Sequence, residues 1–166
     1  MNWVKKILDR IFIEGLSGMA QGLFATLIVG TIIQQIGTLI GGQSGSLIFA
    51  VGKAAAALTS AGIGVGVAYR FKTSPLVILS AASAGMVGGF ASQLLAGTIF
   101  VDGAVRLTGP GEPLGAFIAA YIGIETGRLV SGKTKIDILV TPAVTIGVGS
   151  FIGILIGPAI SEFMTG

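Results

Sequence analysis

One acidic residue flanked by turn-forming residues is the strongest candidate for a binding group in this chain. Glu112 directly precedes Pro113, and the residue before a proline is pushed toward extended backbone geometry. Proline itself suits the first turn of a helix, where its missing N–H is not needed. We therefore expect Glu112 to cap a helix that begins at Pro113, with its carboxylate near the positive end of the helix dipole.

Polar residues also interrupt the long apolar segments of the chain, where an unpartnered polar group is costly. Gln34, Gln35, Lys53 and Gln93 each lie about seven residues inside the predicted outer end of an apolar segment, which is about 10 Å along a helix. Together with Glu112 they form a predicted substrate site, because amide and carboxylate groups match the hydroxyls of a sugar-like solute. The alternative is that Lys53 extends to the surface and the glutamines bond to neighbouring helices.

A second set of charged residues follows the predicted helix that starts at Pro113. Glu125 and Arg128 are spaced i, i+3 and are expected to pair on one helix face. Arg128, Lys133 and Lys135 are candidates for docking a soluble partner on the cytoplasmic side. The alternative is that these cations only anchor the chain at the membrane surface.

The composition excludes several kinds of chemistry. The chain has no cysteine and no histidine, so it offers no thiol nucleophile, no disulfide and no phosphohistidine or phosphocysteine carrier. No P-loop, HExxH or GxSxG pattern is present. We expect no catalytic residue, no metal and no cofactor. Because the basic residues lie at the boundaries of apolar segments, nucleic-acid binding is not expected either.

The overall composition is that of an integral membrane protein. Of the 166 residues, 52% are hydrophobic and only 10% are charged, and the mean hydropathy is +0.94. A soluble domain would carry roughly a quarter charged residues. We treat residues 1–166 as a single membrane domain that is embedded in a lipid bilayer.

The hydropathy pattern predicts an all-α, polytopic protein with about five transmembrane helices. Residues 1–13 place apolar side chains on one helical face and charged ones on the other, which predicts an interfacial amphipathic helix. The predicted spans are about 15–41, 46–68, 75–100, 113–130 and 136–164. The turn 41–45 would join the first two spans, and 101–112 would form a loop or a re-entrant turn.

Lysine and arginine decide the expected orientation. With the N-terminus in the cytoplasm, most of these cations fall in cytoplasmic segments, and the flipped orientation reverses that bias. Glycines at small-xxx-small spacing recur in every predicted span, including Gly18/Gly22, Gly37/Gly41 and Gly85/Gly89. This spacing predicts closely packed helices.

Two segments carry a resemblance to a known family. The turn PGEPLGAF and the segment GKTKIDILVTP, within Pro110 to Gly153, resemble the membrane-embedded IIC subunit of the bacterial phosphoenolpyruvate-dependent sugar phosphotransferase system. The similarity is greatest to the branch that contains perfringolysin-regulator-like proteins. In sugar-transporting relatives a GxxEP-like turn helps to bind substrate, and Glu112 is the matching residue here. Those relatives are about twice this length, and the chain resembles their N-terminal half.

The resemblance implies a permease of the bacterial inner membrane that binds a sugar and presents it to a soluble, phosphorylated IIB protein. It also implies assembly, either as a homo-oligomer or with a second half. Such a chain is at most the permease component of a phosphotransferase, not an enzyme acting alone. The alternatives are a membrane regulator that senses a ligand without transporting it, and a passive channel or structural half-module.

Overall fold

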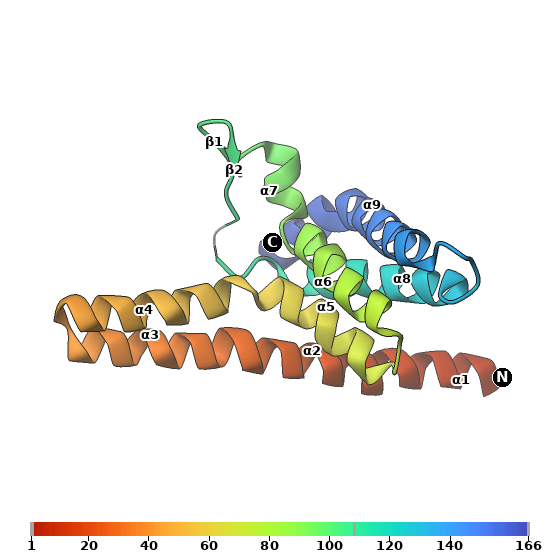
Figure 1. The fold of residues 1–166 in the computed structure, drawn as a ribbon, viewed down its shortest axis with the longest axis horizontal. Helices are drawn as coiled ribbons and strands as arrows, with labels where there is room; N and C mark the ends of the chain where they lie inside the picture. The colour runs from red at the N-terminus through yellow and green to blue at the C-terminus, as the bar shows by residue number, and fades with distance from the viewer. Residues whose placement is uncertain (1, 108, 166) are drawn as a thin grey trace.

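The computed structural model describes residues 2–107 and 109–165, so Met1, Thr108 and Gly166 lie outside the description. The described chain is mostly helical, with one short β-hairpin and several connecting loops (Figure 1). Its elements follow in the order α1 (Asn2–Asp9), η1 (Arg10–Gly15), α2 (Leu16–Leu23), η2 (Phe24–Ile28), α3 (Val29–Ile40), α4 (Gly42–Ala57), α5 (Thr59–Arg70), α6 (Pro75–Gly89), α7 (Ala91–Ala96), β1 (Phe100–Val101), β2 (Ala104–Val105), α8 (Pro113–Val130) and α9 (Asp137–Thr165). The all-α fold class is confirmed.

The first five elements form one continuous helix. It runs from Asn2 to Ile40 without a break, with two short π-helical segments, η1 and η2, inside it. The helix therefore passes straight through the boundary that the sequence predicts between the amphipathic segment and the first span. A continuous helix leaves no unpaired backbone groups at that boundary, which suits entry into a membrane.

A helical hairpin, α3 with α4, extends beyond the rest of the molecule (Figure 1). Its turn consists of Gly41 and Gly42, whose φ angles of +69° and +66° favour glycine. The prediction that the turn reaches Gly45 was wrong, because α4 already begins at Gly42 and Gly45 is buried against the backbone of Gly37. The backbone-to-backbone contact between Gly37 and Gly45 lets α3 and α4 run side by side.

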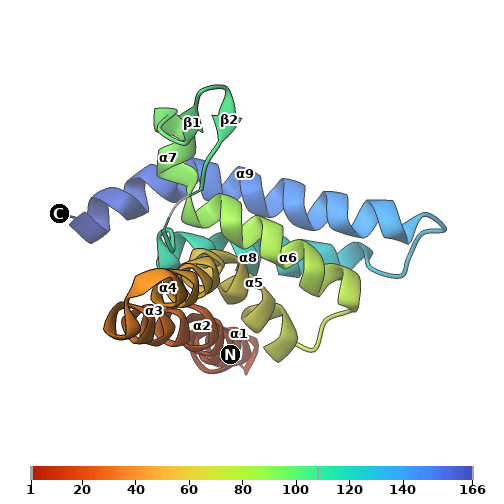
Figure 2. The same ribbon diagram turned by 60° about the vertical axis from the view of Figure 1, so that its left-hand side comes forward.

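Helices α5, α6, α8 and α9 form the packed body of the molecule, and α2 packs against α5 (Figure 2). The buried core includes Ile63 and Val67 of α5, Val77 of α6 and Ile124 of α8. The predicted close packing of small residues is confirmed at the α2–α5 contact. A methyl group added at Gly18 would collide with the backbone at Gly66, and one added at Gly22 would collide with the backbone at Gly62.

The predicted count of five spans is not confirmed by the lengths and apolar character of the helices. Among the described residues, two helices are long and apolar enough to cross a membrane, Asn2–Ile40 and Asp137–Ile160. A third is obtained if α4 and α5, which are bent by 51°, count as one span. The predicted third span is divided at Phe90 into α6 and α7, and α8 includes two charged residues, Glu125 and Arg128.

The predicted loop after the third span has a defined structure. Strands β1 and β2 pair in antiparallel register, with Phe100 opposite Val105, and their side chains are exposed. The hairpin projects from the helical body (Figure 2), whereas α7 packs against α9, where the Ser92 hydroxyl donates a hydrogen bond of 3.2 Å to the carbonyl oxygen of Gly157. The chain then returns to the body through the turn that contains Glu112.

Candidate functional site

The turn 109–112 is held at the meeting point of two interrupted helices. The Ser60 hydroxyl, at the start of α5, donates a hydrogen bond of 2.7 Å to the carbonyl oxygen of Pro110. The backbone N–H of Glu112 donates one of 2.7 Å to the carbonyl oxygen of Gly89, at the end of α6. The turn is thus fixed to both helices through its backbone, and we call this arrangement the clamped turn.

The interruptions themselves follow from the local sequence. At Leu58, the chain leaves α4 and starts α5, and the Thr59 hydroxyl donates 2.6 Å to the carbonyl oxygen of Ala56. Thr59 and Ser60 are both fully buried, so their hydroxyls replace backbone partners that water would otherwise supply. Interrupted helices at membrane depth need such internal partners, and in transporters they commonly form the substrate site.

Glu112 caps α8 as the sequence predicts. Its backbone is extended, and its carboxylate Oε1 accepts a hydrogen bond of 3.0 Å from the backbone N–H of Leu114. Helix α8 begins at Pro113. The side chain is half-buried, and a carboxylate can accept further bonds beyond this single one.

A cavity of about 520 Å³ lies beside the clamped turn, between the α3–α4 hairpin and the chain that leads into the turn. Gln34 of α3 and Lys53 of α4 both line it, as does Pro110, so the structure brings these two predicted residues to one site. The remaining described lining residues are largely aliphatic: Leu27, Thr31, Ala50, Ala54, Ala56, Ala57, Leu107 and Gly109. Gln34 approaches α4 closely because Gly52, opposite it, has no side chain.

The other two predicted glutamines lie elsewhere. Gln35 is exposed on α3, and Gln93 is exposed on α7, beyond the interruption at Phe90. As far as the described residues define the cavity, neither glutamine lines it. The expectation of one polar layer assumed that residues 75–100 form one straight helix, and the change of direction at Phe90 removes Gln93 from that layer.

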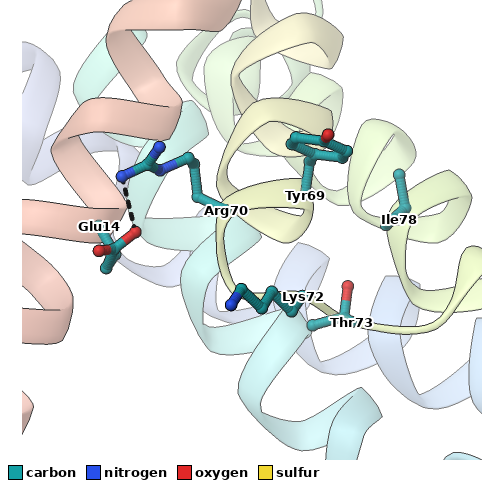
Figure 3. A pocket seen from close by; sticks show the side chains of 6 residues that line it. All are labelled: Glu14, Tyr69, Arg70, Lys72, Thr73 and Ile78. Carbon is teal, nitrogen blue, oxygen red and sulfur yellow. Dashed lines mark ion pairs between the residues drawn. The ribbon is translucent and has the colours of Figure 1, made fainter.

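Three arginines, Arg10, Arg70 and Arg128, gather at one end of the molecule, which we call the basic end, and they pair there with two carboxylates. Glu125 pairs with Arg128 at 3.3 Å, as predicted, and also with Arg10 of the N-terminal helix at 2.8 Å. Glu14 pairs with Arg70 at 2.9 Å (Figure 3). Nothing local in the sequence indicates the pairs that involve Arg10 and Arg70, because their partners are distant along the chain.

The predicted docking cations lie at this same end. Arg128, Lys133 and Lys135 are all exposed, the last two in the loop between α8 and α9. Ser131 and Ser74 share a hydrogen bond of 2.9 Å, which ties this loop to the loop before α6. Among residues 2–107 and 109–165, no group of three or more acidic side chains is arranged to hold a metal ion.

The clamped turn makes a direct prediction about two glycines. Gly111 and Gly109 have similar φ angles, +79° and +82°, but only Gly111 is crowded, by Ser60, Gly89 and Phe90. Alanine at Gly109 should cost about 1–2 kcal/mol through backbone strain alone. Alanine at Gly111 should cost about 1–3 kcal/mol more, because it also overpacks the junction. Thermal unfolding of the purified variants in detergent measures the difference, and equal losses would contradict the clamp.

A family model described as phosphotransferase system, EIIC matches residues 13–166. No curated protein matches the chain, and no solved structure does. The matched range includes the clamped turn, the cavity residues and all of the basic end except Arg10. The chain therefore belongs to the EIIC family of the phosphotransferase system, the membrane components of phosphotransferase transport.

Proposed function

We propose that the chain binds a sugar in the cavity beside the clamped turn, as the permease component of a phosphotransferase transporter. The observation that carries this proposal is a cavity lined by Gln34 and Lys53 that borders the clamped turn at Gly109 and Pro110. Amide and ammonium groups hydrogen-bond to sugar hydroxyls, and the aliphatic lining suits the C–H faces of a sugar ring. Glu112 caps α8 and is not among the described lining residues, but it lies two residues after Pro110, which is. Its carboxylate is the proposed acceptor for one sugar hydroxyl at this edge.

The proposed transport step uses the interruptions at Leu58 and Phe90. Both lie next to the clamped turn, so a change of angle at either would move the turn and the cavity wall together. Rigid segments that rotate about short breaks are a common means of exposing a site to alternate sides.

The proposed phosphoryl donor is a soluble IIB protein that docks at Arg128, Lys133 and Lys135. The chain itself has no histidine or cysteine to carry the phosphoryl group.

The proposed orientation places the basic end in the cytoplasm. Arg10, Arg70 and Arg128 gather there through Glu14 and Glu125. Cations flanking membrane spans favour the cytoplasmic side. The Gly41–Gly42 turn, at the far end of the α3–α4 hairpin, then faces outward.

The role of Glu112 is tested by Glu112→Gln. Glutamine keeps an oxygen that can cap α8 but removes the charge, so folding should change little. Losing a charge-assisted hydrogen bond should weaken sugar binding by about ten- to a hundred-fold. Binding of a panel of radiolabelled hexoses to the purified protein measures this effect, together with the melting temperature.

The matched control is Gln35→Ala, which removes an exposed amide outside the cavity. It should leave affinity unchanged. If Glu112→Gln binds sugar as tightly as the unmodified chain, Glu112 is a helix cap without a role in binding.

The orientation is tested with single cysteines, which are unambiguous in a chain without natural cysteine. A membrane-impermeant maleimide should label Ser44→Cys in intact cells, because position 44 lies next to the outward turn. It should label Lys72→Cys and Lys133→Cys only after the membrane is permeabilised. Labelling of Lys133→Cys in intact cells would overturn the proposed orientation.

A further inference from the structure

A second pocket, distinct from the proposed sugar cavity, opens at the basic end. It has a volume of about 630 Å³ and lies where α5 ends, with Glu14 of the N-terminal helix on one side and Ile78 of α6 on the other (Figure 3). Its described lining is completed by Tyr69, Arg70, Lys72 and Thr73. These groups combine two cations, one carboxylate, hydroxyls and an aromatic ring.

The charge balance of this pocket favours an anion. Among the described lining residues, Glu14 is the only acid that opposes Arg70 and Lys72, and its Oε2 already pairs with Nη2 of Arg70 at 2.9 Å. An arginine has five N–H donors, so one ion pair leaves donors for a second acceptor. Lys72 is exposed and carries no ion pair within the described chain that would neutralise it.

The backbone at Lys72 is unusual. Its φ angle is +56°, a left-handed conformation that favours glycine over a long side chain. The conformation closes α5, since the N–H of Lys72 donates 3.0 Å to the carbonyl oxygen of Tyr69. Glycine is the usual residue at such a helix end. A lysine there accepts backbone strain and places a cation at the mouth of the pocket.

A separate apolar groove lies along α2, η2 and α5 and borders this pocket at Tyr69. It has a volume of about 290 Å³, and Tyr69 lines both the groove and the pocket. The other described lining residues are uncharged: Gln21, Gly22, Ala25, Thr26, Gly62, Val65 and Gly66. The Thr26 hydroxyl is already bonded to the carbonyl oxygen of Gly22 at 2.6 Å. From Gly62 to Tyr69 the groove follows about 10 Å of helix.

We propose that the pocket and the groove together bind one anionic phospholipid. The phosphate lies against Arg70 and Lys72, and an acyl chain lies along the groove. Tyr69 stands at the boundary between them, the position that aromatic side chains favour at a membrane interface. A cationic pocket that opens onto an apolar channel between helices fits a lipid headgroup with its chain. A small phosphate compound would use only the first half of this site.

The test measures lipid binding to the purified full chain in neutral detergent by native mass spectrometry. Phosphatidylglycerol should bind at least about tenfold more tightly than phosphatidylcholine of the same chain length, because only the former carries a net charge for Arg70 and Lys72. Glycerol 3-phosphate, which has the phosphate without the chains, should bind far more weakly than phosphatidylglycerol. Equal binding of the two lipids, or equal binding of glycerol 3-phosphate, overturns the proposal.

Two pairs of variants locate the lipid. Lys72→Gly should weaken phosphatidylglycerol binding by roughly tenfold, and it should fold normally because glycine suits the backbone there. Lys133→Gly, which removes an exposed cation outside the pocket, should have little effect.

Ala25→Trp should block the groove, whereas Ala20→Trp, on the same helix but outside the described lining, should not. Unchanged binding in Lys72→Gly, or equal losses within either pair, overturns the assignment.

Discussion

Two hydrogen bonds join the turn 109–112 to the broken ends of α5 and α6, and each satisfies a backbone carbonyl: that of Gly89 at the end of α6 and that of Pro110 in the turn itself. Within a membrane no water supplies missing hydrogen bonds, so each interruption of a helix must be satisfied by protein. The hydroxyl of Ser60 and the backbone N–H of Glu112 join the turn to α5 and α6 with two bonds of 2.7 Å each. The position of α8, which starts in the next residue, then follows from the turn.

Glycine makes this arrangement possible by removing side chains where backbones meet. A side chain at Gly89 would collide with Ser60, and one at Gly115 would collide with the backbone of Gly88. The same device joins α2 to α5 and α3 to α4. Since lipid gives helices little hydrophobic reason to associate, such close packing supplies much of the stability. The resulting α3–α4 hairpin leaves large apolar side chains exposed, for example Leu39 and Leu47, as expected of a surface within a bilayer.

Local signals in the sequence predicted local structure well. The prolines and Glu112 predicted the start of α8 and its cap, and the i, i+3 spacing predicted the pair of Glu125 with Arg128. Both features depend on residues within one helical turn of each other.

Features that depend on tertiary contacts could not be predicted in this way. The hydrogen bond from Ser60 to Pro110 and the ion pair between Arg10 and Glu125 join residues that are far apart along the chain, so no local pattern predicts either one. The interruption at Phe90 was missed because the sequence there stays apolar, and this error misplaced Gln93. Gly45 was assigned to a turn because glycine is common in turns, but it serves helix contact with Gly37.

The central claim is that sugar occupies the cavity between the α3–α4 hairpin and the clamped turn. The most direct measurement is the alkylation rate of Ala54→Cys, a position that lines this cavity, with and without saturating hexose from the panel that binds. Bound sugar should slow alkylation at position 54 and leave alkylation of Ser44→Cys unchanged. Equal rates at position 54 with and without bound sugar would contradict it.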